Sequence, residues 1–204
     1  MSAATPRIEP LPIGEWSEQA VEALRTAFGD AAADRLLSTV SDAPRMPNVL
    51  TTLMRHPDLA GPFLCYNAVL LNTPSVEPRQ RELMILRVAW RTRSTYEWAQ
   101  HVRMAQSCGI TADEIDAIGL GAGAGIWSPV EADLLAATDQ LLDDVRIHDD
   151  TWARLAEHLD ERQLMEVPFV VGTYTCLAMA FNSFGLELDP DLDGSAPLLP
   201  DPEP

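Results

Sequence analysis

Residues 81–103 read RELMILRVAWRTRSTYEWAQHVR, and this stretch decides the fold. Its first half, up to Trp90, is apolar on most sides, as expected of a helix buried in a core. A second helix is predicted to begin after Ser94 or Thr95 and to end at Gly109, because glycine favours helix C-termini. The stretch therefore predicts two consecutive helices, the first of them in the interior of the protein.

Helix signals continue on both sides of this stretch. Ser17 can cap a helix that runs to about Phe28, and capping boxes begin at Thr111 and at Ser128. Further helices are expected over residues 30–40, 48–55, 59–71, 151–159 (capped by Asp150) and 161–184, the last one kinked or split at Pro168. No alternating strand pattern occurs, so the sequence predicts an all-α domain of about eight helices.

The two ends of the chain differ in composition from the rest. Residues 1–12 contain three prolines, and residues 189–204 are acidic and proline-rich, so both are predicted to be flexible tails around a domain over residues 13–188. The N-terminus lacks the apolar region of a secretory signal, and no run of about 18 uncharged apolar residues occurs. We therefore expect a cytoplasmic protein without a membrane span.

The charge distribution is uneven. The net charge of −17 disfavours nucleic acids and anionic membranes as partners. All 14 basic residues are arginines, and six of them lie within residues 79–103, where only Glu82 and Glu97 oppose them and the local charge is +4. Two interpretations remain open: the arginines pair with acids elsewhere in the protein, or they attract an anionic substrate.

Candidate catalytic groups lie in the same stretch. Glu97 and His101 are four residues apart, so a helix places them on one face, where a carboxylate can orient and charge an imidazole for proton transfer. Glu82 is a charged residue in an otherwise apolar helix, which implies a partner. That partner is either Arg81 or Arg87 at the helix surface, or His101 in a buried site.

Other side chains are weaker candidates for a functional site. Cys65, Cys108 and Cys176 are far apart and form no Cys-x-x-Cys pair, which argues against a disulfide framework, a zinc cluster and dithiol chemistry. We expect neither a metal nor a cofactor, because Glu97 and His101 lack further ligands at metal-binding spacing. Asn67 and Tyr174 are polar residues in apolar helices, where they either satisfy backbone groups or line a pocket.

The runs RELMILRVA (residues 81–89), YEWAQHVR (residues 96–103) and GITADE (residues 109–114) resemble the carboxymuconolactone decarboxylase family, which shares the AhpD-like fold. The peroxidase branch of this superfamily carries Cys-x-x-Cys-x-x-x-His, with a Glu nineteen residues before the His. In this chain the Glu and the His are Glu82 and His101, but the two cysteines fall on Ser94 and Glu97, and a relay His falls on Tyr96. The resemblance therefore implies acid/base chemistry rather than thiol chemistry, in an AhpD-like homo-oligomer, a trimer or a hexamer.

The resulting hypothesis is a cofactor-independent lyase or isomerase that acts on a small, anionic organic substrate by decarboxylation, isomerisation or lactone chemistry. His101 would be the general acid/base, Glu97 would orient it or act as the base, and Glu82 would be the second carboxylate of the relay. Substrate-binding roles are predicted for Tyr96, Ser94, Trp98, Arg87, Asn67 and Tyr174, with Arg103 as a second candidate for binding a substrate carboxylate.

Two alternatives stay open. One is a peroxiredoxin-like redox protein that uses one of the three cysteines outside the usual motif. The other is a non-catalytic, oligomeric binding protein, in which Glu82 would pair with an arginine and would not face His101.

Overall fold

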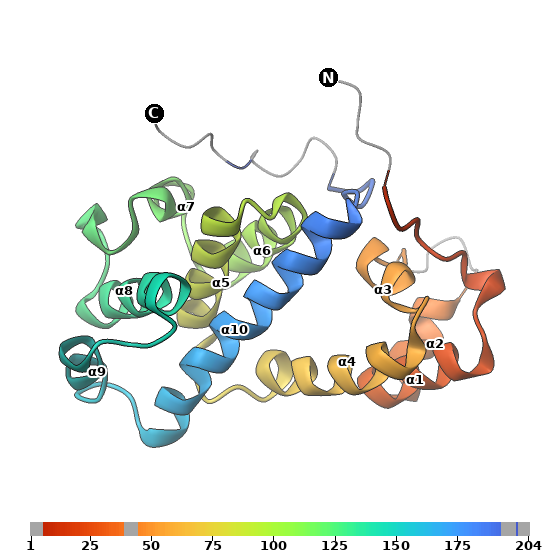
Figure 1. Ribbon diagram of the computed structural model, residues 1–204, viewed down its shortest axis with the longest axis horizontal. Coiled ribbons are helices and arrows are strands. Elements are labelled where there is room, and N and C mark those ends of the chain that lie inside the picture. The colour runs from red at the N-terminus through yellow and green to blue at the C-terminus, as the bar shows by residue number, and fades with distance from the viewer. Residues whose placement is uncertain (1–5, 39–44, 193–198, 200–204) are drawn as a thin grey trace. The chain divides into compact units, whose positions relative to one another are not determined.

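The computed structural model describes residues 6–38, 45–192 and 199, and these contain ten α-helices, two 3-10 helices and no strand (Figure 1). The predicted all-α class is thus confirmed, with ten α-helices where about eight were expected. The residues divide into two compact units, which we describe separately. The prediction of one domain over residues 13–188, flanked by flexible tails, stays a prediction.

The first unit comprises residues up to Thr73 together with Ser183–Asp189. Its elements are η1 (Ile13–Glu15), α1 (Glu18–Phe28), α2 (Asp30–Leu37), α3 (Asn48–Leu53) and α4 (Pro57–Asn72). Ser17 caps α1 as predicted, because its hydroxyl accepts the backbone N–H of Ala20. Helices α1 and α4 approach closely at Gly61, where an added Cβ would meet the Ala23 Cβ at 3.2 Å. A glycine therefore allows the central packing of this unit.

Both predicted tails contain residues that make contacts within the first unit. The backbone N–H of Arg7 donates to the carbonyl of Phe184 at 2.7 Å, and Leu11 donates to the carbonyl of Thr51 at 3.1 Å. The Asp189 carboxylate accepts the backbone N–H of Asn48 at 2.7 Å. The remaining parts of the predicted tails, residues 1–5, 193–198 and 200–204, lie outside the described residues, as do residues 39 and 40 of the predicted second helix.

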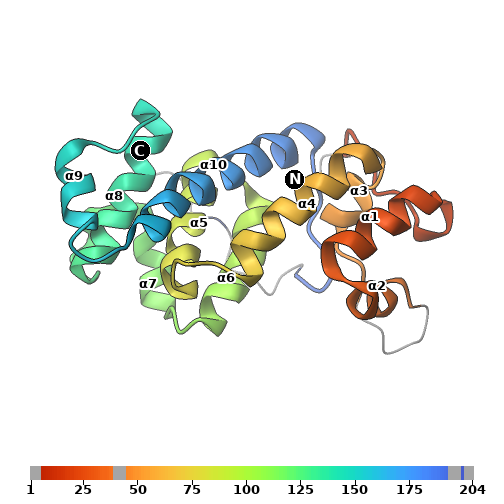
Figure 2. The ribbon, with the colours of Figure 1, turned by 90° about the horizontal axis from the view of Figure 1, so that it is seen from below.

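The second unit, residues 74–182 and 190–204, contains all candidate catalytic residues. Its elements are α5 (Pro78–Thr92), α6 (Thr95–Ser107), α7 (Ala112–Ala117), η2 (Ile118–Ala124), α8 (Pro129–Asp144), α9 (Asp149–Leu155) and α10 (Glu161–Phe184), whose last two residues belong to the first unit (Figures 1 and 2). Both predicted capping boxes are present, at the N-termini of α7 and α8.

The core of the second unit forms around α5 and α6. Residues Leu83 to Ala89 of α5 are all buried, as the sequence predicted. Arg93 adopts the left-handed conformation, with φ of 56°, and so reverses the chain between the two helices. The two helices run antiparallel, since Arg79 at the start of α5 donates to the Gly109 carbonyl just after α6. The side chains from both helices pack with α7, η2 and α8 in one apolar cluster: Leu83, Leu86, Ala89, Trp98, Val102, Ala105, Ile110, Ile115, Ile118 and Leu135.

Two details of the predicted helices are wrong. Helix α10 is one continuous helix of 24 residues that contains Pro168, so the predicted split there is wrong, and the alternative of a kink stays a prediction. By length and mean hydropathy of 1.5, α10 could cross a membrane, and half of its apolar window is buried inside the protein. Helix α9 begins two residues earlier than expected, at Asp149, with His148 rather than Asp150 at the N-cap. The side chains of His148 and Asp144 instead pair with each other at 2.8 Å.

Candidate active site

Glu82 and His101 meet in the interior of the second unit. His101 Nδ1 lies 2.7 Å from Glu82 Oε2, and Glu82 is fully buried. The other oxygen, Oε1, accepts hydrogen bonds from Arg81 Nη2 at 2.9 Å and from Arg81 Nε at 3.2 Å. Glu82 therefore binds both His101 and Arg81, which the sequence had offered as alternative partners. The contact with Arg81 is buried and does not lie at the helix surface.

The charges of His101 and Arg81 determine the protonation state of Glu82. Burial alone would raise the pKa of Glu82, but the hydrogen bonds and the charges of His101 and Arg81 outweigh burial and lower it below its ordinary value. Glu82 is therefore ionised near neutral pH. Arg81 was missing from the predicted site, although it neighbours Glu82 in the sequence; adjacent helix residues seldom face each other, and only the long arginine side chain allows this contact.

Tyr174 of α10 completes the surroundings of His101. The two rings pack edge to face, with their centroids 4.9 Å apart. Burial raises the pKa of Tyr174, and the negative charges of Glu82 and Glu97 raise it further, so the phenol lies within electrostatic reach of both carboxyl groups. The phenol therefore stays protonated and can serve as a hydrogen-bond donor.

Glu97 is placed differently from the prediction. It lies on the same helix as His101, four residues before it, but Glu82 and not Glu97 forms the hydrogen bond to the imidazole. Glu97 is 1% exposed, and neither of its carboxyl oxygens has a hydrogen-bond partner. Burial raises the pKa of Glu97 well above its ordinary value, and the nearby Ser94 hydroxyl opposes this rise without forming a hydrogen bond of good geometry. Burial therefore favours the neutral, protonated form of the Glu97 carboxyl.

Ser94, just before α6, shares this lack of partners. It is fully buried, and its Oγ has no hydrogen-bond partner. Buried polar groups in native proteins are nearly always hydrogen-bonded, and the exceptions deserve a functional explanation. Two residues separate Ser94 from Glu97, so one short segment at the start of α6 places an unsatisfied hydroxyl and an unsatisfied carboxyl in the interior.

Trp98, Tyr96 and Asn67 were predicted to bind substrate, and these roles stay predictions. Trp98 is 1% exposed and belongs to the apolar core, because a step of one residue from Glu97 turns the side chain to another side of α6. Tyr96 packs edge to face on Phe181, and its hydroxyl accepts a hydrogen bond from Gln100 at 3.2 Å. Asn67 lies on α4 in the first unit.

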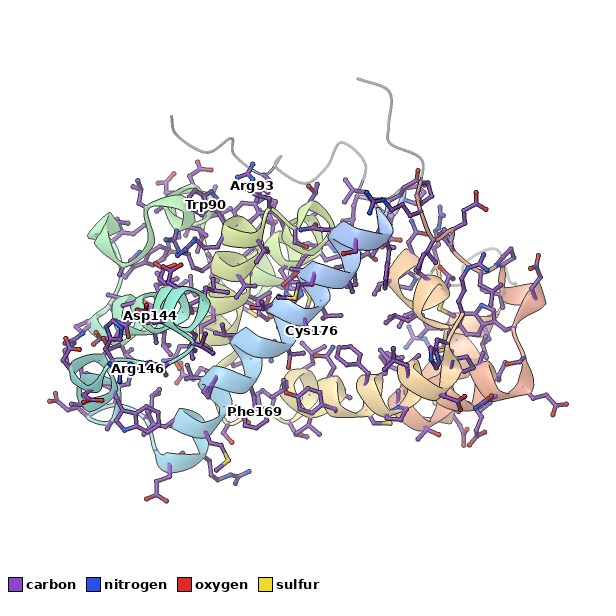
Figure 3. The ribbon with its side chains drawn as sticks, in the orientation of Figure 1. Trp90, Arg93, Asp144, Arg146, Phe169 and Cys176 are labelled. Atoms are coloured by element: carbon purple, nitrogen blue, oxygen red, sulfur yellow. The ribbon has the colours of Figure 1, made fainter. Side chains whose placement is uncertain are left out.

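Arg87 is a fourth predicted substrate-binding residue, and its guanidinium is already occupied by partners within the protein. It forms a two-point ion pair with Asp139 at 2.8 and 2.9 Å and donates to the carbonyls of Ile118 and Gly119. Its guanidinium carbon also lies 4.9 Å from the ring of Trp90, which is labelled in Figure 3. Four of the five N–H groups are thus satisfied inside the protein, and little remains to hold a substrate carboxylate.

The other arginines of this stretch also pair with acids. Arg79 binds Glu114 and Glu131, and Arg91 binds Asp139 and Asp143. Arg103, the second candidate for a substrate carboxylate, forms an exposed pair with Asp191 at 3.0 Å. The first of the two interpretations of the arginine-rich stretch is therefore the one realised: these arginines stabilise the unit.

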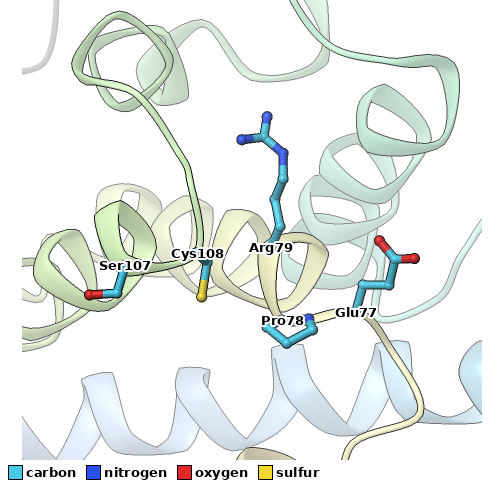
Figure 4. A pocket seen from close by; sticks show the side chains of 5 residues that line it. All are labelled: Glu77, Pro78, Arg79, Ser107 and Cys108. Atoms are coloured by element: carbon cyan, nitrogen blue, oxygen red, sulfur yellow. The ribbon is translucent and has the colours of Figure 1, made fainter.

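Cys108 is the cysteine nearest to the candidate site. It lines a pocket of about 450 Å³ with Glu77, Pro78, Arg79 and Ser107 (Figure 4). Burial raises the pKa of the Cys108 thiol, and the negative charge of Glu82 raises it further, while Arg81 partly opposes the effect. All three cysteines are free, and Cys65 lies in the other unit. A raised pKa lowers the thiolate fraction that redox chemistry requires.

Comparisons with known proteins agree with this architecture. The carboxymuconolactone decarboxylase family matches residues 57–140, which include both Glu82 and His101. A search among curated proteins finds no match.

Several solved structures share the fold. A complex of a debrominase variant, Bmp8, with 2,3,4-tribromopyrrole has a TM-score of 0.72 at 12% identity, covering 95% of this chain and 97% of the other. An uncharacterised peroxidase-related protein with an AhpD core from Ralstonia eutropha has a TM-score of 0.70 at 18% identity, covering 93% and 96%.

A third structure is a protein of unknown function from Agrobacterium tumefaciens, a putative antioxidant defence protein AhpD, with a TM-score of 0.62 at 14% identity, covering 67% of this chain and 94% of the other. At such low identities the likeness concerns the fold alone. The family match over residues 57–140 and the shared fold together support a relationship to the carboxymuconolactone decarboxylase and AhpD-like superfamily.

Proposed function

We propose that this protein is a cofactor-independent enzyme that transfers protons to and from carbon in a small carbonyl compound. One observation carries the proposal: two buried carboxyl groups of the same unit have pKa values displaced in opposite directions, Glu82 downward and Glu97 upward. Such a divergence is the usual mark of a site that needs one charged group and one proton donor.

In this proposal the Glu82–His101 pair is the base. An ionised Glu82 accepts the hydrogen bond from Nδ1–H of His101, and this interaction selects the tautomer whose lone pair is on Nε2. Arg81 holds the other oxygen of Glu82 and so keeps the carboxylate oriented. The edge-on contact with Tyr174 restrains the imidazole ring from a second side. A neutral, oriented imidazole of this kind can accept a proton from carbon at Nε2.

Glu97 is the proposed proton donor. As a neutral acid without a partner, it holds a proton that it can deliver to a ligand in the interior. Ser94, whose hydroxyl also has no partner, and Tyr174, whose phenol stays protonated, are proposed to donate hydrogen bonds to the oxygen that becomes negative in the reaction.

In the proposed isomerisation, His101 and Glu97 move protons in turn. Nε2 of His101 takes a proton from the carbon next to the carbonyl, and the C–H electron pair moves into an enolate whose oxygen Ser94 or Tyr174 binds. Glu97 then protonates the far carbon of the conjugated system, and a proton returns from the imidazolium to the Glu97 carboxylate.

The balance of charges around the candidate site indicates whether an anionic or an uncharged substrate fits it. Arg81 balances Glu82, and Glu97 is neutral, while Arg79, Arg87 and Arg91 are paired with acids elsewhere in the unit. The attraction for an anion that the arginine-rich stretch suggested is therefore largely cancelled. We propose a substrate that is small and uncharged, such as an unsaturated lactone or ketone, in place of the anionic one.

The test uses hydrogen exchange, because it detects proton abstraction even without net turnover. A panel of unsaturated lactones and enones is incubated with the protein in D₂O, and NMR follows deuterium incorporation at carbon. His101→Gln and Glu97→Gln should each lower the rate by about a hundredfold to ten-thousandfold, the usual span for one acid/base group. A triple Cys→Ala variant of Cys65, Cys108 and Cys176 is the matched control and should keep the rate. Unchanged exchange in both site variants would rule out the assignment.

The triple Cys→Ala variant also tests the alternative that the protein is a cysteine-dependent redox protein. The raised pKa of Cys108 weighs against a thiolate nucleophile, so hydroperoxide reduction that depends on cysteine is not expected. If the wild-type protein reduces hydroperoxides and the triple variant does not, the redox interpretation replaces the one proposed here.

A further inference from the structure

The candidate site lies in the interior of the second unit, so a substrate needs a passage to it. Glu82 and Ser94 are fully buried, and Glu97 is 1% exposed. Tyr174 is 2% exposed, and His101 is 7% exposed. Among the groups proposed to act on the substrate, His101 is therefore the one that solvent reaches most. A passage from the surface should lead to its imidazole.

The pocket that contains Cys108 lies at one end of the two helices that carry Glu82 and His101. Its volume is about 450 Å³, within the range of pockets that hold small organic ligands. Figure 4 shows its walls, which come from the start of α5 and the end of α6: Glu77, Pro78, Arg79, Ser107 and Cys108. These two ends meet because α5 and α6 are antiparallel. We call this space the Cys108 pocket.

Helix geometry places the Cys108 pocket in line with the buried Glu82–His101 pair. Cys108 follows His101 by seven positions, nearly two turns and about 10 Å along α6, so both side chains are on one face of that helix. On α5, Pro78 precedes Glu82 by four positions, about one turn or 6 Å. Because the helices are antiparallel, both steps lead from the pair to the same end of the two helices.

The charges next to His101 act on the wall of the Cys108 pocket. Burial raises the pKa of the Cys108 thiol, the negative charge of Glu82 raises it further, and Arg81 lowers it. Coulomb interactions weaken with distance and are screened by water, so little separates these two buried groups from the thiol. The pocket and the candidate site are therefore neighbours.

Met104 lies between the Cys108 pocket and the imidazole. It follows His101 by three positions and precedes Cys108 by four, so it shares one face of α6 with both residues. Its side chain is half-buried. Methionine is unbranched and has three rotatable bonds, so its side chain can change rotamer while the helix stays in place. One rotamer of Met104 can therefore close a passage that another leaves open.

We propose that the Cys108 pocket is the vestibule through which the substrate reaches His101, and that Met104 gates the passage between them. The proposed function enters only by naming His101 as the group to be reached. The vestibule fits a small, uncharged molecule: Arg79 in its wall is already paired with Glu114 and Glu131, and the exposed Glu77 repels anions.

Diethyl pyrocarbonate tests the passage, because this small, uncharged reagent acylates imidazoles independently of any turnover. In a Cys65→Ser, Cys176→Ser variant, N-phenylmaleimide labels the remaining thiol, Cys108, and mass spectrometry follows the acylation of His101. The label should slow that acylation at least about tenfold, because its phenyl ring occupies a pocket of ligand size. The exposed His158 is the internal reference and should react at an unchanged rate.

A second thiol provides the matched control for the label. Cys176 is exposed and lies two positions after Tyr174, so its side chain leaves another side of α10 than the one that packs on His101. In a Cys65→Ser, Cys108→Ser variant, the same label on Cys176 should leave the acylation of His101 unchanged.

Substitutions at Met104 test the gate without a label. Met104→Ala should speed the acylation of His101 and Met104→Trp should slow it. The two rates should differ at least about tenfold, because truncation leaves a gap and overpacking fills the passage. Met179→Ala and Met179→Trp are the controls: Met179 is 66% exposed on α10, so both should keep the wild-type rate. Circular dichroism establishes that each variant is folded.

The outcomes separate the passage from the chemistry. If no substrate of the panel exchanges hydrogen but the label on Cys108 still protects His101, the vestibule stands and the proposed function fails. Acylation of His101 that the Cys108 label leaves unchanged would overturn the vestibule, and equal rates in the two Met104 variants would overturn the gate. The label requires no substitution in the passage, so it decides the question even where Met104→Trp does not fold.

Discussion

The contact of α5 with α8 and the contact of α6 with α10 both bury polar side chains, but in opposite states. Between α5 and α8, the Arg87 guanidinium makes four hydrogen bonds to Asp139 and to two backbone carbonyls. At the start of α6, the Glu97 carboxyl and the Ser94 hydroxyl make none, although both are as deeply buried. The first arrangement maximises stability and leaves no group for a ligand, whereas the second keeps polar groups available.

This difference separates structure from candidate function within a single stretch of sequence. Residues 87 and 97 are both charged residue types on consecutive helices, and the sequence offered both as site residues. The number of satisfied hydrogen bonds, rather than the residue type or the burial, tells them apart. The four predictions that follow test the two regions from the largest expected effect to the smallest.

Replacing Arg87 with Met should destabilise the protein by about 3–5 kcal/mol, because it leaves two carbonyls without their donor and leaves the partly buried Asp139 with Arg91 as its remaining partner. Urea unfolding followed by circular dichroism measures the change. A loss below about 1 kcal/mol would mean that the ion pair contributes no more than a surface pair does.

Gly121→Ala should also disturb the Arg87–Asp139 pair and destabilise the protein by about 1–3 kcal/mol. Gly121 has a φ of 61°, and an added Cβ would lie 2.9 Å from Arg87 Nη2 and 3.3 Å from Asp139 Oδ2. Arg87→Met removes the side chain that the added Cβ would crowd. In that background, Gly121→Ala should therefore lower the free energy of unfolding by less than it does in the wild-type protein. A double-mutant cycle of unfolding free energies measures that difference. Strict additivity would contradict the packing described here.

Glu97→Gln should change how stability depends on pH. Because the folded protein raises the pKa of Glu97 above its ordinary value of 4.5, the neutral acid contributes its stability fully below pH 4.5, and this contribution is lost as the pH rises through the raised pKa. Glutamine cannot ionise, so the wild-type protein should lose stability relative to the variant by up to about 1.4 kcal/mol per pH unit in that window. Urea titrations at steps between about pH 5 and 8 detect this, and parallel curves would show that Glu97 is not held neutral.

Arg103→Ala should have the smallest effect, at most about 1 kcal/mol, because its pair with Asp191 is more than half exposed on both sides. It is also the control for Arg87→Met, since both substitutions remove an arginine that pairs with an aspartate. Exchange of substrate hydrogen should be unaffected, and a large loss of that activity would restore Arg103 as a candidate for binding the substrate.

The sequence by itself determined the elements of this protein. The caps at Ser17, Thr111 and Ser128 begin helices because their side-chain oxygens satisfy the free N–H groups of the first turn. The apolar run from Leu83 predicted the most deeply buried helix, and the spacing of the family motif pointed to Glu82 and His101. These features are local, or lie within one motif, and so can be read from residue type and periodicity.

The tertiary structure decided which of these residues act together. It paired His101 with Glu82, nineteen positions away, and left Glu97, which shares its helix, without a partner. It joined Arg87 to Asp139, 52 positions away, and brought Tyr174 onto the imidazole. It also kept α10 continuous through Pro168. Charge satisfaction and pKa depend on distances between side chains of different helices, and those distances follow from packing, which residue spacing along the chain does not specify.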